Sequence, residues 1–207
     1  MNESNTAHWQ NIYTNKQPHE VSWTQPVPQT SLDYIKNLKL PKSASIIDIG
    51  GGESRLVDFL LEDGYTNISV LDISAKALEK TRQRLGADAA KVKWIVSDIT
   101  SFQPTEKYNV WHDRVAFHFL ISSHQKEKYK ALVDEFAKGY LIMAAFSTSG
   151  PLKCSGLTIQ QYSAETMKEF FKENFELIDA KTEDHITPFN TKQNFLWCLF
   201  KRKENDI

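Results

Sequence analysis

Three aspartates and a run of three glycines are the residues of this chain best suited to hold a ligand. Asp48 comes just before the glycine run 50–52, and Asp72 and Asp98 lie further along, each ending a short apolar run. Glycine has no Cβ and tolerates positive φ, so a ligand can lie against bare backbone there. The carboxyl ends of parallel strands meet at one edge of a sheet, so we expect these residues to face one crevice. Aspartates also end strands and cap helices without any ligand, but three in register with a glycine run favour a binding site.

The pattern around the glycines favours a cationic nucleoside over a dinucleotide. Arg55 stands where a G-x-G-x-x-G motif has its third glycine, and Glu53 adds negative charge where a pyrophosphate would lie. Anions bind at helix N-termini through unopposed backbone amides, so these acids disfavour a diphosphate. Asp72 follows the turn by about 20 residues, which is the spacing of an acid that binds ribose hydroxyls.

The elements that must position these residues alternate between strand and helix. Short apolar or alternating runs predict strands at 45–50, 67–74, 91–99, 107–113, 140–147, 175–185 and 194–203. Helical spacing and capping residues predict helices starting at Ser31, over 55–63, after Ser74 to Leu85, over 124–139 and over 163–174. This alternation predicts an α/β fold with a mostly parallel sheet. The last two strands have no helix between them, so we expect the final strand to run antiparallel.

Composition excludes several classes of partner. The 207 residues carry 25 basic and 26 acidic side chains, a formal net charge of -1, which gives no electrostatic case for binding nucleic acid or an anionic membrane. Cys154 and Cys198 are far apart and form no C-x-x-C pair, and the N-terminus lacks the features of a secretory signal. No apolar run is long enough for a membrane helix. We therefore expect a cytoplasmic monomer of one domain, without a metal site.

Three motifs resemble the S-adenosylmethionine-binding motifs of class I methyltransferases. "IIDIGGGESRL" resembles motif I in its D-x-G-x-G form, "VLDIS" resembles motif II, and "IVSDI" resembles the motif III region. The resemblance implies a doubly wound, seven-stranded, mostly parallel sheet with a reversed last strand, of Rossmann-like type, with S-adenosylmethionine as cofactor and S-adenosylhomocysteine as product. The cofactor-binding residues that it implies are Asp48, Gly50, Gly51, Gly52, Asp72, Ile73, Asp98, Ile99 and His112.

The resemblance extends over most of the chain. "HWQNIYTNKQPHEVSW" is similar to the opening of a small bacterial subgroup, which in turn is similar to lysine methyltransferases acting on citrate synthase and on translation elongation factor. "WHDRVAFHFL" and "GPLKCSGLTIQQYS" match the bacterial members. We expect residues 1–30 to form an aromatic cover, residues 31–203 the methyltransferase domain, and residues 204–207 a polar tail. The acceptor stays open at this point between a protein lysine and a small molecule.

The acceptor is expected among loops at the same edge of the sheet. Candidates for contact with the cofactor or acceptor, beyond the motifs, are Trp9, Tyr13, Trp23, His118, Cys154, Tyr162 and His185. Each has an alternative role: the aromatic residues before residue 30 can be a hydrophobic cover, His118 a packed core histidine, and Cys154 and Tyr162 parts of a packed loop. His185 can be a plain strand-end residue.

Methyl transfer from a sulfonium is an in-line displacement, which needs alignment above all. A base is needed only for an acceptor that arrives protonated, and Asp113 or His112 is the candidate. Asp113 can instead order its loop by pairing with Arg114. Two other readings compete: a non-catalytic module that binds S-adenosylmethionine, and a nicotinamide oxidoreductase, which the missing third glycine disfavours.

Overall fold

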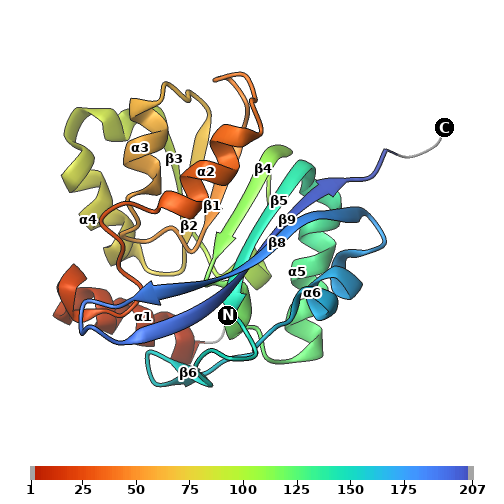
Figure 1. The fold of residues 1–207 in the computed structure, drawn as a ribbon. Helices are drawn as coiled ribbons and strands as arrows, with labels where there is room; N and C mark the ends of the chain where they lie inside the picture. The colour runs from red at the N-terminus through yellow and green to blue at the C-terminus, as the bar shows by residue number, and fades with distance from the viewer. Residues whose placement is uncertain (1–2, 205–207) are drawn as a thin grey trace.

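A seven-stranded sheet forms the centre of the computed structural model, which describes residues 3–204 (Figure 1). The strand order is β3-β2-β1-β4-β5-β9-β8. The strands are β1 (Ile46–Ile49), β2 (Ile68–Asp72), β3 (Val92–Val96), β4 (Tyr108–Arg114), β5 (Ala137–Phe146), β8 (Phe175–Ile186) and β9 (Lys192–Arg202). A small separate hairpin joins β6 (Lys153–Cys154) to β7 (Leu157–Thr158). Of the expected polar tail, residues 205–207 lie outside the described residues.

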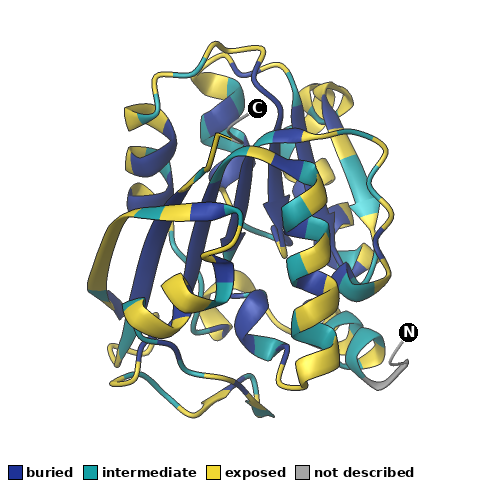
Figure 2. Ribbon diagram, turned by 90° about the vertical axis from the view of Figure 1, so that its right-hand side faces the viewer, coloured by how far each residue is buried: buried dark blue, intermediate teal, exposed yellow. Residues whose placement is uncertain are grey.

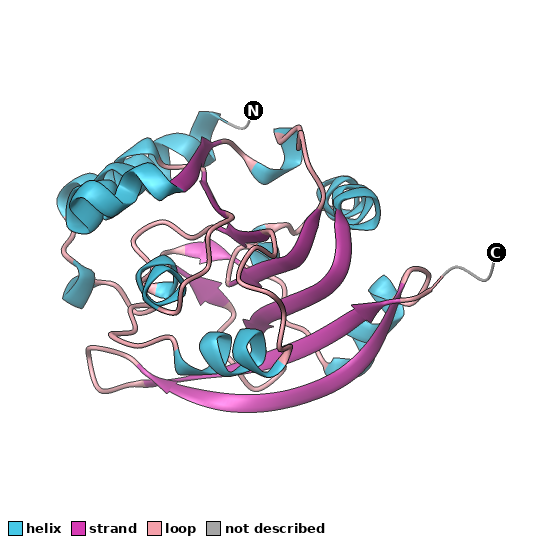
Figure 3. Cartoon of the chain, turned by 90° about the horizontal axis from the view of Figure 1, so that it is seen from above, coloured by secondary structure: helices cyan, strands magenta, loops and turns pink. Residues whose placement is uncertain are grey.

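Strands β1 to β5 pair in parallel, and β9 pairs antiparallel with both β5 and β8. The expected reversed strand is therefore confirmed, and so is the Rossmann-like methyltransferase fold. Residues 187–191 connect β8 to β9, which is too short for a parallel crossover. Figure 3 shows the two strands as a long curved hairpin.

Helices cover both faces of the sheet and bury two hydrophobic cores. The helices are α1 (Glu3–Asn15), α2 (Gln29–Asn37), α3 (Leu56–Glu62), α4 (Ala75–Leu85), α5 (Ser123–Phe136) and α6 (Ala164–Phe171). One core packs α5 and α6 on one face of the sheet, and the other packs α2, α3 and α4 on the opposite face. Figure 2 shows the buried strands between helices whose outer sides are exposed. No helix of the described part is long and apolar enough to cross a membrane.

The structure differs from the sequence expectations at three elements. Residues 3–15 form a helix, where the sequence suggested only an aromatic cover. Ser31 lies inside α2, which begins at Gln29, and its hydroxyl bonds to His112 instead of capping the helix. Helix α5 ends at Phe136, and Gly139 belongs to β5. A Cβ at Gly139 would lie 2.5 Å from the carbonyl oxygen of Asn109, so glycine there permits close approach of β5 to β4.

Candidate active site

A cavity of about 430 Å³ lies where β1 to β4 end, between the sheet edge and the N-terminal residues. Its walls come from the glycine turn, the ends of β2 and β3, the segment after β4, and residues 5–28. The predicted residues that line it are Trp9, Tyr13, Trp23, Gly50, Gly51, Asp72, Ile73, Asp98, Ile99 and Cys154. The predicted residues outside its lining are Asp48, Gly52, His112, Asp113, His118, Tyr162 and His185.

The glycine turn is shaped first by the chain's own atoms. Gly50 has φ +67, and a Cβ there would lie 2.8 Å from the Cβ of Ala116. A Cβ at Gly51 would lie 2.7 Å from Oδ2 of Asp48, and one at Gly52 would lie 2.9 Å from Oδ2 of Asp72. Real Cβ contacts are not this short, so larger residues at these positions would displace the neighbouring groups. Glycine here lets two carboxylates and the segment after β4 pack against bare backbone.

A buried polar chain fixes the first of these carboxylates. Nδ1 of His112 lies 2.7 Å from Oδ1 of Asp48, its register partner on β1, and Nε2 lies 2.9 Å from Oγ of Ser31. All three residues are almost fully buried. Because both ring nitrogens of His112 are engaged, the ring positions Asp48 instead of facing the cavity. The expectation that His112 contacts the cofactor or acts as a base does not fit this geometry.

Asp72, at the end of β2, lines the cavity with a carboxyl group whose pKa is raised. Burial, together with the nearby charge of Asp48, raises its pKa to about 7, although hydrogen bonds from the backbone N–H groups of Ser74 and Gly52 act in the opposite direction. The Ser74 hydroxyl caps α4 as expected, by accepting from the backbone of Ala77. Each carboxylate oxygen has more than one lone pair, so Asp72 can also accept hydrogen bonds from a neighbouring diol in the cavity.

Asp98 and two isoleucines form the next part of the wall. Oδ1 of Asp98 accepts from the backbone N–H and the hydroxyl of Thr100, at 2.8 Å each, and so caps the short helix Ile99–Ser101. Its Oδ2 makes no hydrogen bond to the described residues. Ile73 and Ile99 line the cavity beside these acids. The carboxylate therefore keeps one free acceptor oxygen next to apolar side chains.

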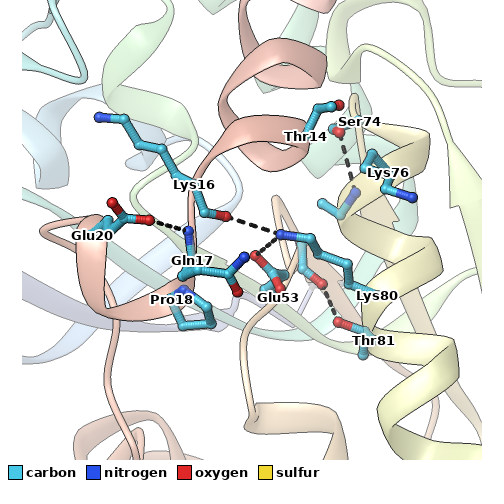
Figure 4. A network of polar contacts seen from close by, with 12 residues as sticks. Thr14, Lys16, Gln17, Pro18, Glu20, Glu53, Ser74, Lys76, Lys80 and Thr81 are labelled. Carbon is cyan, nitrogen blue, oxygen red and sulfur yellow. Dashed lines mark hydrogen bonds and ion pairs between the residues drawn. The ribbon is translucent and has the colours of Figure 1, made fainter.

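Residues of the N-terminal segment close the cavity from outside. Trp9 packs edge to face on Trp23 and Phe119, with ring centroids 5.6 and 5.1 Å apart. His8 contacts Ser155 of the β6–β7 hairpin at 3.2 Å. Figure 4 shows Lys80 of α4 reaching both the carbonyl of Lys16 and the carboxylate of Glu53, so that the end of α1 and the glycine turn share one cation.

Asp113 lies on the other side of β4 from His112, because successive strand residues point to opposite faces. Its Oδ1 accepts from the backbone N–H groups of Ala116 and Phe117, at 2.9 and 3.1 Å, and its Oδ2 accepts from the Tyr129 hydroxyl at 2.7 Å. Burial raises its pKa to about 6. Asp113 is fully buried and does not line the cavity. The catalytic role of Asp113 stays a prediction. In this geometry the carboxylate orders the segment after β4, and it does so without pairing with Arg114.

Three further predicted residues are buried away from the cavity. His118 accepts a bond from the backbone of Phe146, and burial lowers its pKa to about 3, so the ring is neutral. The Tyr162 ring packs on Phe117. Nε2 of His185 lies 2.7 Å from the carbonyl oxygen of Ser22 and so fastens the N-terminal segment to β8. None of these three residues lines the cavity, so their contact with an acceptor stays a prediction.

Arg114, at the end of β4, lines the cavity and was not among the expected site residues. Both terminal nitrogens of its guanidinium donate to the carbonyl oxygen of Trp23, at 3.2 and 3.1 Å. Burial lowers its pKa. The sequence assigned Arg114 only to a pair with Asp113, and its position after a strand end was the signal that could have placed it in the crevice.

Residues 46–138 match the family model of a methyltransferase domain, which spans β1 to the start of β5 and includes the glycine turn, Asp72 and Asp98. The chain therefore carries a methyltransferase domain. Its fold is that of the S-adenosylmethionine-dependent enzymes. No curated protein sequence matches the chain significantly.

Solved structures of low sequence identity share the fold over nearly the whole chain. An S-adenosylmethionine-dependent methyltransferase from Anabaena variabilis superposes with TM-score 0.75 at 16% identity, over 98% of this chain and 96% of that one. The 1,6-didemethyltoxoflavin-N1-methyltransferase of Burkholderia thailandensis, with its substrate and S-adenosylhomocysteine bound, has TM-score 0.69 at 14% identity, over 98% and 85%. Magnesium protoporphyrin IX methyltransferase from Synechocystis with bound S-adenosylmethionine has TM-score 0.67 at 15% identity, over 98% and 93%.

Proposed function

We propose that this methyltransferase binds S-adenosylmethionine across the ends of β1 to β4 and transfers its methyl group to a small molecule held in the same cavity. One observation carries the proposal: Asp72 and Asp98 end neighbouring strands and face one cavity beside the glycine turn. Asp72 would accept bonds from the ribose hydroxyls. The free Oδ2 of Asp98 would accept from the adenine amino group, between Ile73 and Ile99.

The charges at the turn suit a cationic ligand. The carboxylate of Asp48 lies directly beneath Gly51, and Glu53 lines the cavity with Lys80 as its partner. A pyrophosphate would meet these acids, whereas the ammonium and sulfonium groups of the cofactor would be attracted to them. When bound, the cofactor supplies an electrophilic methyl group. The protein then contributes by fixing the position of Asp48 through its hydrogen bond to His112, and by orienting the cofactor and the acceptor.

The arrangement favours catalysis by alignment rather than by a base. Asp113 already accepts three hydrogen bonds, and His112 is engaged at both ring nitrogens. Burial raises the pKa of the Cys154 thiol to about 12, so this group is neutral. The rings of Trp9, Trp23 and Phe119 line the cavity, and a ligand packed against them would have less contact with water. An acceptor whose nucleophile arrives unprotonated fits this site.

A small acceptor is supported by the cover over the cavity, where α1 and residues 17–28 lie between the glycine turn and solvent. The Burkholderia enzyme of similar fold acts on a small molecule. A protein lysine is the second candidate, supported by the resemblance of residues 8–23 to the opening of the lysine methyltransferases. A lysine side chain would have to enter beside Trp9 and Trp23.

Calorimetry and labelling test the proposal together. We expect the protein to bind S-adenosylhomocysteine but not NAD, and expect Asp72→Asn to weaken that binding about 10- to 100-fold, since a charged acceptor is lost. Asp88→Asn, at an exposed acid paired with Lys91, is the control.

With labelled S-adenosylmethionine and cell extract, label should enter small molecules. Label in protein would select the lysine alternative, and binding without any transfer would show a non-catalytic module.

A further inference from the structure

Strand β8 forms one edge of the seven-stranded sheet and is 12 residues long. Among the described residues its backbone hydrogen bonds go to β9 alone, so the N–H and C=O groups on its outer side have no partner there. Figure 3 shows β8 as the outer strand of the curved hairpin. Unpaired groups along a strand edge can pair with a strand of another chain.

Two charged side chains of β8 lack an ion pair within the described part of the chain. Lys181 is exposed, and its Nζ lies 5.5 Å from the ring centroid of Tyr34. Glu183 is half-buried, and its Oε2 accepts a hydrogen bond from Thr30 at 2.6 Å. Residues two apart on a strand point to the same face. The edge strand therefore carries one positive and one negative side chain on one face, each without an oppositely charged partner.

Antiparallel pairing of β8 with β8 of a second copy would bring these charges together. When Thr182 lies on the two-fold axis, Lys181 of each strand lies opposite Glu183 of the other. Opposite charges that face each other across two strands stabilise the pairing. Ile178 and Ile186, which are 47% and 52% exposed, lie at the two ends of this overlap. Each end of the interface would then bury an isoleucine from both strands.

The neighbouring registers that keep the same faces of the two sheets together match less well. Centring the pair on either of these two charged residues would place it opposite its own copy, and like charges directly opposite destabilise a strand pair. Centring on Ala180 keeps an attraction between Lys181 and Asp179 but places Asp184 opposite Glu176. Charged side chains on an edge strand commonly prevent pairing. Here their order along β8 favours the single register about Thr182.

We propose that the protein forms a homodimer in which the two β8 strands pair antiparallel about Thr182 and join the two sheets into one. The sequence favours a monomer, because a free strand edge cannot be seen in its composition. The inference is independent of the proposed function, since β8 contributes no residue to the lining of the cavity. The hydrogen bonds from Ser22 to His185 and from Thr30 to Glu183 place the N-terminal segment next to this interface.

Sedimentation equilibrium tests whether the dimer exists. At about 100 μM the wild type should approach twice the chain mass of 23.8 kDa, and it should dissociate on dilution. Thr182→Lys should keep the chain monomeric, because two lysines would then face each other on the two-fold axis. Thr182 is exposed, so this change leaves the core intact. Glu176→Lys is the control on the same strand, and it should dimerise like the wild type because it lies beyond the overlap.

Mixing two charge-reversed variants tests the register itself. Lys181→Glu and Glu183→Lys should each weaken dimerisation about 10-fold or more, since two attractive pairs become repulsive in each homodimer. An equimolar mixture of the two should dimerise again, because the acidic strand of one variant then faces the basic strand of the other. Mixing cannot repair the lost contacts with Thr30 or Tyr34. Recovery would therefore identify the pairs across the interface.

Three results would overturn the proposal. A wild type that stays monomeric at every concentration would show that the edge does not pair with a second copy. A dimer that persists in Thr182→Lys would place the interface elsewhere on the molecule. Two charge-reversed variants that remain monomeric when mixed would refute the register. Thermal unfolding of each variant confirms that it is folded before its mass is measured.

Discussion

The charged form of Asp72, which would bind the ligand, lowers the stability of the folded protein. Burial, together with the charge of Asp48, raises the pKa of Asp72 to about 7. The folded protein therefore keeps this proton to a higher pH than the unfolded chain does. By linkage, stability is greatest below about pH 4 for this group and is lost as the pH rises to about 7. Asp113, with a pKa of about 6, acts in the same direction over a lower range.

We expect the melting temperature of the protein without added cofactor to fall as the pH rises from about 4 to about 7. Asp72→Asn should flatten this part of the profile and raise the melting temperature at pH 8 by about 3 °C or more, because no charge is then buried. Scanning fluorimetry over a pH series measures both effects. Part of the slope below about pH 6 should persist in the variant through Asp113. A variant with the wild-type slope throughout would contradict the assignment to Asp72.

The cavity-lining acids could be predicted from sequence, and the role of the polar residues on β4 could not. An aspartate that ends a parallel strand reaches the ligand edge by the topology alone. His112 and Asp113 point to opposite faces, and the sequence does not tell which distant group meets each one. His112 is hydrogen-bonded to Ser31 of α2, and Asp113 accepts hydrogen bonds from the backbone after β4.

At the level of elements, the glycine turn depends on the segment after β4. A Cβ at Gly50 would lie 2.8 Å from the Cβ of Ala116, and the φ of +67 adds backbone strain. Gly50→Ala should lower the free energy of unfolding by about 1–3 kcal/mol and weaken S-adenosylhomocysteine binding. Adding Ala116→Gly should restore part of the loss, with a coupling energy of about 0.5–1.5 kcal/mol. Denaturant unfolding and calorimetry measure these quantities.

Gly64→Ala is the matched control for the turn, since Gly64 has φ +88 and nothing within 4 Å of a Cβ. It should show the cost of strain alone and no coupling to Ala116. If Gly50→Ala and Ala116→Gly were additive, the contact between the two segments would not shape the turn.

Helices and strands with a clear hydrophobic periodicity could be predicted from the sequence. Elements whose limits depend on contacts with distant residues could not. The strands of the sheet follow from short apolar runs, and the short link after β8 requires the reversed strand. Helix α1 has few apolar residues, with only Trp9 and Tyr13 one turn apart as its inner face, so its periodicity is weak. The boundary between α5 and β5 was misjudged because Gly139 meets Asn109 of β4 rather than ending a helix.

For the whole molecule, the N-terminal cover and the hydrophobic cores are separate. Neither core contains a residue before Tyr34, although Trp23 packs against one of them. Deleting residues 1–16 should leave a protein that unfolds cooperatively by circular dichroism, while S-adenosylhomocysteine binding weakens about 10-fold or more, because Trp9 and Tyr13 are lost from the cavity wall. Trp9→Ala should give a smaller loss. Wild-type affinity in the truncated protein would show that the cover does not contribute to binding.

The contacts of residues 22–34 with β8 join parts of the chain that a ribosome makes at very different times. Ser22 bonds to His185, Thr30 to Glu183 and Tyr34 to Asp179, across 163, 153 and 145 residues. At about 5–20 residues per second, the early segment emerges roughly 10–30 s before its partners. During translation the segment that leads into the sheet therefore waits for β8, and the cavity gains its full cover only after the chain has passed that strand.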